Sequence, residues 1–473
     1  MPQRFTPTDA VRKIRGHLDH PIVDGDGHLL EFVPLVLDIA AEVAGPRAAE
    51  RLRAFLAGAT DPRSSRFAPA RVFWGLPEEN TLDRMTATLP DLLYRRTEEL
   101  GLDFVMLYPS MGLTILGLPD DEVRRTATRA LNLYYAEAYA GYRDRLEPVA
   151  VIPLFDPQEA IEDLEHAVSL GLRAFVTSGA VPRSHDRDGA PRQWIDTLGH
   201  ESLHDYDPFW ARCEELRMAP AFHGVGYGWG SRWSSSNYVY NHIGNFASAQ
   251  EAACRSLFLG GVPRRFPGLR FAFLEGGVAW GCQLLADLVG HFEKRNRDAV
   301  RQFDPRRFDL DAARALLAEH ARGRIAERGE RYLELAAEMK AAPRDPDPRA
   351  VDDFADSLIE DPAEIVEVFA KSFYFGCECD DPLSALAFDG GLLPRGARLN
   401  AIFGSDIGHW DVPDMREVLP EAWELVEDGH LDAEAFRDFT FGNVVRMFTA
   451  ANPEFFAGTA VADAVRKLPP RAG

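Results

Sequence analysis

The chain has 473 residues, of which 46% are hydrophobic and 11% aromatic, so it can bury a large core. Its 74 acidic and 52 basic residues give a formal net charge of -22, which argues against nucleic acid and anionic membranes as partners. Five cysteines form no disulfide framework, and no signal sequence or membrane-spanning run is recognisable, so we expect a cytoplasmic protein.

Eight short and almost continuously apolar runs are predicted to be β-strands, with segments of helical periodicity between them. They cover residues 22–26, 103–109, 146–154, 173–178, 219–224, 269–275, 372–378 and 399–406. Such runs are typical of a parallel sheet that is covered on both faces, and eight of them predict an α/β protein with a (β/α)8 TIM barrel. The competing fold, a doubly wound open sheet, would usually carry a glycine-rich phosphate loop after its first strand, and the sequence has none there.

We expect one domain over residues 1–473 that carries two insertions. Residues 179–206 are polar and are predicted to be a loop after the fourth strand. Residues 296–370 are charged, with helical spacing but few large apolar residues, which indicates a helical excursion from the barrel. That excursion would either cover the barrel mouth or form a subunit contact, and the second alternative would give a homodimer.

The first predicted strand ends in Asp26-Gly27-His28. On an extended backbone residues two apart share a face, so Asp26 and His28 can present a carboxylate and an imidazole to one point. Glycines at 25 and 27 let the backbone approach that point closely. The pair could therefore hold a divalent metal ion, although an aspartate and a histidine at a strand end are also typical of a solvated turn.

Four further predicted strands end in residues that bind metals or transfer protons. His223 ends the fifth strand, Glu275 the sixth and Glu378 the seventh, and Asp406 ends the eighth with His409 in the loop behind it. Barrel enzymes place their chemistry at these carboxyl ends, so we expect the set to converge. Each residue alone also has a structural interpretation, as a core histidine, a helix cap or a solvated loop acid.

The Asp-x-His pair, AFHG at His223, LRFAFLEGGVAW at Glu275 and IFGSDIGHW at Asp406 together resemble the amidohydrolase-related proteins. This branch of the amidohydrolase superfamily contains metal-dependent hydrolases and non-oxidative decarboxylases such as the aminocarboxymuconate semialdehyde and γ-resorcylate enzymes. The resemblance, from about residue 20 to 450, implies that Asp26, His28, His223 and Asp406 bind the metal and that Asp406 exchanges protons. Two positions depart from the pattern: Glu275 stands where the decarboxylases usually carry a histidine, and Asp26 where many relatives have one. Such oxygen-rich ligation suits iron or manganese as well as zinc.

An ion held by this quartet with an open position would activate water and polarise a substrate oxygen. Asp406 or His409 could then act as general base, and Glu275 is a third candidate catalytic group. Glu275 and Glu378, with His242, would also suffice to bind a second ion, so the sequence leaves the choice between one ion and two open.

Substrate contacts are expected from the loop after the fifth strand. Its glycine, serine and aromatic residues suit the wall of a pocket that offers polar groups to a substrate. Arg232 could grip a substrate carboxylate with two parallel hydrogen bonds, or it could stack on a neighbouring tryptophan as a structural residue. The candidate substrate-binding residues are Tyr227, Trp229, Arg232, Trp233, Tyr238, Arg183 and Trp410.

We therefore predict a metal-dependent hydrolase or non-oxidative decarboxylase that acts on a small aromatic or carboxylated compound with zinc, iron or manganese. One alternative is a di-iron oxygenase, which the carboxylate-rich site would suit on the same barrel. The other is a non-catalytic barrel that serves as a binding or scaffold protein.

Overall fold

The computed structural model describes residues 5–60, 79–187, 190–224, 234, 237–343 and 352–469. Its centre is a ring of parallel strands in the order β1-β2-β3 and β4-β5-β8-β9-β10-β11. The bounds are β1 Val23–Leu29, β2 Phe104–Pro109, β3 Leu146–Pro148, β4 Ala150–Val151, β5 Phe175–Thr177, β8 Pro220–Phe222, β9 Phe271–Phe273, β10 Phe373–Glu378 and β11 Asn400–Gly404.

Backbone hydrogen bonds join these two sheets into one barrel. β3 and β4 form one continuous run, in which the Val149 N–H donates to the carbonyl of Leu107 on β2 (3.0 Å) and the Ala150 N–H to that of Ala174 beside β5 (2.9 Å). On the other side, the Asp406 N–H donates to the Asp26 carbonyl at 3.0 Å and the His28 N–H to the Ile407 carbonyl at 2.8 Å. The eight predicted strands thus close into a (β/α)8 barrel, and the prediction of the fold is confirmed.

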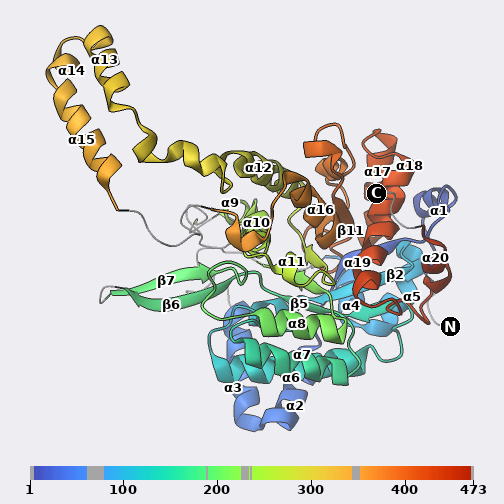
Figure 1. The fold of residues 1–473 in the computed structure, drawn as a ribbon. Coiled ribbons are helices and arrows are strands. Elements are labelled where there is room, and N and C mark those ends of the chain that lie inside the picture. The colour runs from blue at the N-terminus through green and yellow to red at the C-terminus, as the bar shows by residue number, and fades with distance from the viewer. Residues whose placement is uncertain are drawn as a thin grey trace.

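Helices surround the ring, and Figure 1 shows α6, α7 and α8 side by side along one side of it. Aspartates cap several of them, because a side-chain carboxylate accepts from the first free N–H groups of a helix. Asp120 caps α6, Asp156 caps α7, and Asp361 forms a capping box with Glu364 on α16. The helices around the barrel are α6 Asp121–Ala138, α7 Pro157–Ser169, α8 Asp207–Leu216, α10 Asn245–Leu259, α12 Ala279–Arg295, α16 Pro362–Ser372 and α19 Asn443–Ala451.

The remaining helices extend this layer or lie beyond it. They are α1 Asp9–Arg15, α2 Val33–Ala44, α3 Pro46–Thr60, α4 Thr81–Thr88, α5 Pro90–Leu100, α9 Tyr238–His242, α11 Val262–Arg265, α17 Val418–Glu427, α18 Ala433–Arg437 and α20 Ala462–Lys467. α2 and α3 pack on the outer face of α6. Within the described residues, no helix is both long and apolar enough to cross a membrane.

The two predicted insertions contain regular structure. Within 179–206, β6 Val181–Arg187 and β7 Ala190–Asp196 form an antiparallel ladder, where we had predicted a loop. Their polar sequence has no apolar run, and the ladder itself pairs the backbone groups that a loop would leave to water. Within 296–370, α13 Leu310–His320, α14 Arg324–Glu327 and α15 Gly329–Ala341 form an arm that projects away from the barrel (Figure 1). The organisation as one domain with two insertions stays a prediction.

Candidate metal centre

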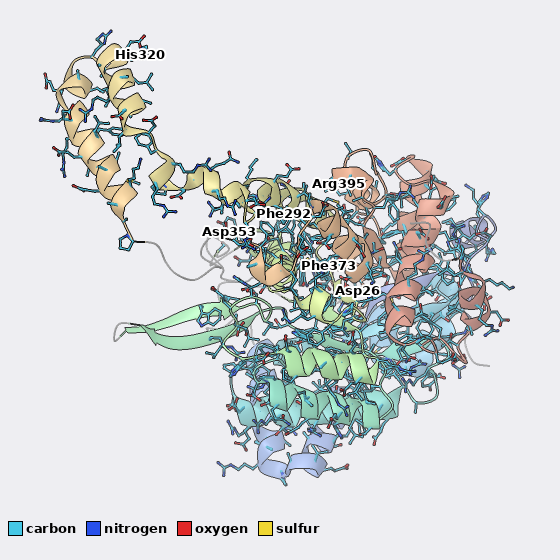
Figure 2. The ribbon with its side chains drawn as sticks, in the orientation of Figure 1. Asp26, Phe292, His320, Asp353, Phe373 and Arg395 are labelled. Atoms are coloured by element: carbon cyan, nitrogen blue, oxygen red, sulfur yellow. The ribbon has the colours of Figure 1, made fainter. Side chains whose placement is uncertain are left out.

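The candidate metal ligands lie together at the carboxyl edge of the barrel. Asp26 and His28 belong to β1, His223 follows β8 directly, and Glu275 lies two residues after β9. Asp406 lies two residues after β11. Figure 2 shows Asp26 inside the body of the molecule.

The side chains of these residues face one another at short distances. His28 Nε2 lies 3.1 Å from Glu275 Oε1, 3.4 Å from Asp406 Oδ1 and 3.5 Å from Asp26 Oδ1. His223 Nε2 lies 3.0 Å from the same Glu275 oxygen. Two overlapping groups result, each with one ligand atom per residue and all four atoms within 4.8 Å of one another: Asp26, His28, His223 and Glu275, and His28, Glu275, Asp406 and His409.

Glu275 belongs to both groups, so it is more central than the sequence indicated. Its Oε1 faces three imidazoles, since His409 Nδ1 also lies 3.4 Å away. The sequence assigned the first ion to a quartet without Glu275 and kept this glutamate for a second ion or for proton transfer. The geometry instead places it beside every histidine of the cluster.

The polar atoms that face the centre of this cluster lack hydrogen bonds. Among the described residues, no hydrogen bond reaches Asp26 Oδ1, Glu275 Oε1, Asp406 Oδ1 or either ring nitrogen of His28 and His223, all of them buried. Leaving such atoms without a partner is costly, and a coordinated cation removes that cost. Two imidazoles and three carboxylates are a donor set that manganese, iron and zinc accept. The residues present therefore fit a divalent metal ion.

Burial and crowding shift the pKa values of the three carboxyl groups. Burial raises the pKa of Asp26 to about 7, with His223 opposing the rise and Glu275 adding to it. Burial also raises the pKa of Asp406 well above its usual range, reinforced by the negative charges of Glu275 and Glu378. Burial acts in the same direction on Glu275, but the imidazoles, His223 foremost, hold the pKa of this carboxyl well below its usual range.

Asp24 forms hydrogen bonds that link β1 to the end of β11, the two strands whose ends carry Asp26 and Asp406. It is fully buried and accepts hydrogen bonds from the Asp26 N–H at 3.1 Å, the Ser405 N–H at 3.1 Å and the Ser405 hydroxyl. A side chain at Gly27 would place its Cβ only 2.6 Å from Asp24 Oδ2, so this position requires glycine. Asp406, next to Ser405, has a positive φ of 49°, a backbone strain that this surrounding structure holds in place.

A cavity of about 180 Å³ opens beside the cluster, and its walls are acidic. It is lined by His242, Gly244, Phe246, Ala247, Glu275, Gly276, Glu378, Asp406 and Asp411. Glu378 and His242 thus lie near the ligands, as predicted for a second ion, but neither belongs to the two compact groups found in the described part of the chain. Their role as ligands stays a prediction.

His409 faces both Asp406 and a residue that the sequence did not indicate. Its Nδ1 lies 2.6 Å from Asp406 Oδ1, its Nε2 lies 3.2 Å from the Ser110 hydroxyl, and its ring stacks on that of His28 with centroids 3.8 Å apart. Ser110 directly follows β2, and Asp411 in the cavity wall follows β11 by seven residues. The position of Ser110 at a strand end is the one signal that could have identified it, whereas Asp411 lies farther along the loop after β11.

The predicted substrate-binding residues are only partly described. Tyr227, Trp229, Arg232 and Trp233 lie outside the described residues. The ring of Tyr238 on α9 lies 5.4 Å from that of Trp410 and 4.9 Å from that of His242, so these three form an aromatic cluster with one member in the cavity wall.

Arg183 is buried in a structural network beside β6. It donates to Asp196 at 3.1 Å, to the Phe155 carbonyl at 2.6 Å and to the Tyr206 hydroxyl at 2.7 Å. These contacts engage all three of its guanidinium nitrogens. Substrate binding by Arg183 stays a prediction from the sequence.

Known proteins resemble the chain at the level of a family and of a fold. The amidohydrolase family matches residues 94–326, whereas no curated protein matches the chain. A dihydroxybenzoic acid decarboxylase from Polaromonas sp. JS666, solved with manganese and 2-nitroresorcinol, has a TM-score of 0.50 and 15% identity over 93% of this chain and 99% of its own. A 5-carboxyvanillate decarboxylase from Sphingomonas paucimobilis has a TM-score of 0.49 and 13% identity over 90% of this chain and 98% of its own. At such identities the likeness to the first is one of fold alone.

Proposed function

We propose that the protein, whose residues 94–326 match the amidohydrolase family, is a metal-dependent enzyme that acts as a hydrolase or non-oxidative decarboxylase on a small aromatic or carboxylated compound. One observation carries this proposal. Buried carboxylate and imidazole atoms from four separate strand ends converge at the carboxyl edge of the barrel without hydrogen bonds of their own.

The proposed ligands are Asp26, His28, His223, Glu275 and Asp406, whose donor atoms surround one point. A divalent ion bound there supplies a Lewis acid that polarises water or a substrate oxygen. Manganese is the first ion to test, because the Polaromonas decarboxylase of the same fold was solved with it. Iron and zinc are equally compatible with the donor set.

Asp406 and His409 are the proposed proton-transfer pair. Asp406 is buried, and burial raises its pKa well above the usual range, which favours a carboxyl group that can take up a proton as well as release one. In hydrolysis it would take a proton from the attacking water and deliver it to the leaving group. In decarboxylation the same carboxyl would protonate the carbon that loses carbon dioxide. His409, 2.6 Å away and facing the Ser110 hydroxyl, orients Asp406 and passes its proton on.

A turnover assay tests the proposal and separates its two reactions. The purified protein is treated with a chelator, reloaded with manganese, iron or zinc, and assayed with aromatic carboxylates and with esters and amides of similar size. Release of carbon dioxide identifies decarboxylation, and incorporation of ¹⁸O from labelled water into a product identifies hydrolysis. The absence of any metal-dependent turnover, together with a protein that binds no metal, would favour the non-catalytic barrel.

A di-iron oxygenase is the second candidate, because of what lines the cavity. Glu378, Asp411 and His242 lie beside Glu275 and Asp406, so further oxygen and nitrogen donors adjoin the proposed ligands. Elemental analysis and an absorption spectrum distinguish the candidates. About two irons per chain, with oxygen consumed in the presence of substrate, would replace the hydrolytic assignment by this one.

A further inference from the structure

The helical arm that leaves the barrel is built without a core of its own. Among the described residues of α13, α14 and α15, only Leu333 is buried. α15 packs against α13, with Arg314 and Glu330 paired across the contact. Helices of this length are only marginally stable in water unless an apolar face is buried. The contacts within the arm bury too little apolar surface to stabilise its helices.

The exposed side of α14 and α15 carries a stripe of four large apolar residues. Ile325, Tyr332, Leu335 and Met339, which we call the arm stripe, are exposed by 68%, 54%, 44% and 64%. Tyr332, Leu335 and Met339 on α15 are spaced three and four residues apart, the spacing of the seam of a coiled coil, and Ile325 on α14 lies one heptad before Tyr332, across the break between the helices at Arg328. Figure 1 shows the arm standing away from the barrel, so the rest of the described chain does not cover the stripe.

Charge points to a second copy of the arm as the partner. Residues 310–341 contain six acidic and six basic residues, whereas the whole chain has a net charge of -22. Two arms can therefore approach each other without the repulsion that opposes two barrels. Arg331 and Glu338 flank the arm stripe at equivalent positions, one heptad apart. In an antiparallel pairing centred near Leu335, each Arg331 lies beside the Glu338 of the other copy.

We propose that the protein is a homodimer held by antiparallel packing of two arms, with the arm stripes buried against each other in a bundle of helices. A two-fold axis through this contact presents the same surface of each chain to its partner, as closed dimers require. The proposal is independent of the chemistry at the barrel edge.

Sedimentation of the full chain over a range of concentrations tests the proposal. The native chain sediments as a dimer, and Leu335→Glu, which puts a charge into the arm stripe, raises the dimer dissociation constant at least about 100-fold. Ala312→Glu adds the same charge at an exposed site on α13 outside the stripe and leaves the constant unchanged. Circular dichroism and melting confirm that each variant is folded.

Charge reversal and a distance measurement test the orientation. Arg331→Glu weakens the dimer, and adding Glu338→Arg restores it, because the two charges exchange places across the contact. A spin label at Ala326→Cys gives one label per arm, since the native cysteines are all buried. Antiparallel arms place two such labels on the order of 30 Å apart. A monomer at every concentration, or a dimer that Leu335→Glu does not weaken, would overturn the proposal, and labels on the order of 10 Å apart would overturn the antiparallel arrangement.

Discussion

Replacing Glu275 by glutamine separates a metal ligand from a structural hydrogen-bond acceptor. The substitution keeps the shape of the side chain and removes its charge. Glu275 lies within 4.8 Å of Asp26 and of Asp406 in the two ligand groups, so with an effective dielectric constant of 20 each ionised pair repels by at least about 3 kcal/mol. The imidazoles of His28, His223 and His409 face the same carboxylate and hold its pKa well below the usual range, so their attraction outweighs this repulsion.

For Glu275→Gln without metal we therefore expect a free energy of unfolding lower by about 1–3 kcal/mol, because the amide loses this net attraction. Affinity for manganese should fall about 150- to 5,000-fold, since the loss of one charged partner at a buried site costs about 3–5 kcal/mol. Denaturant unfolding of the chelated protein gives the first quantity, and calorimetric titration with manganese gives the second.

Glu378→Gln is the matched control, because it makes the same replacement in the wall of the same cavity but outside both ligand groups. It should leave the affinity for the first ion unchanged. If Glu275 instead serves only to accept hydrogen bonds from histidines, Glu275→Gln will lower the free energy of unfolding by about 3–5 kcal/mol and leave manganese binding intact, which would refute the reasoning.

Three further predictions concern the ion and its surroundings. Manganese at about 1,000 times its Kd should raise the free energy of unfolding by about 4 kcal/mol, hence Tm by about 4 °C for a chain of this size, and a scan that is insensitive to chelation would contradict this. Asp406→Asn should lower kcat by about 100- to 10,000-fold, and full activity in this variant would indicate a barrel without catalysis at this residue. Asp24→Asn should weaken metal binding about 10- to 100-fold, because the amide nitrogen that replaces Oδ2 cannot accept from the Ser405 hydroxyl, although Oδ1 can still accept from both N–H groups. Equal metal affinity in the native chain and Asp24→Asn, measured by titration, would mean that Asp24 does not position the ligands.

The barrel was predictable because its strands are buried on both faces and therefore read as apolar runs. Asp26, His28, His223 and Asp406 were predictable for a related reason: they interrupt or directly follow such runs, where a charged or polar residue stands out. The β6–β7 hairpin was missed because its strands are polar and its stability comes from backbone pairing, which leaves no apolar pattern in the sequence.

The central position of Glu275 could not be predicted, since it depends on how far the backbone turns after β9. Glu275 has a positive φ of 55°, an unusual conformation for this residue type, and it sits two residues beyond the end of the strand. Ser110 and Asp411 escaped notice for a similar reason. Serines and aspartates are common in loops, and only the barrel geometry brings these two to His409 and to the cavity.

The central claim is that the carboxyl edge of the barrel holds a divalent ion between Asp26, His28, His223, Glu275 and Asp406. Anomalous diffraction from crystals grown with manganese tests it most directly. The claim predicts an anomalous peak within about 2.0–2.6 Å of donor atoms from these residues. A fully loaded crystal with no peak at this edge, or with its only peak at other residues, would contradict it.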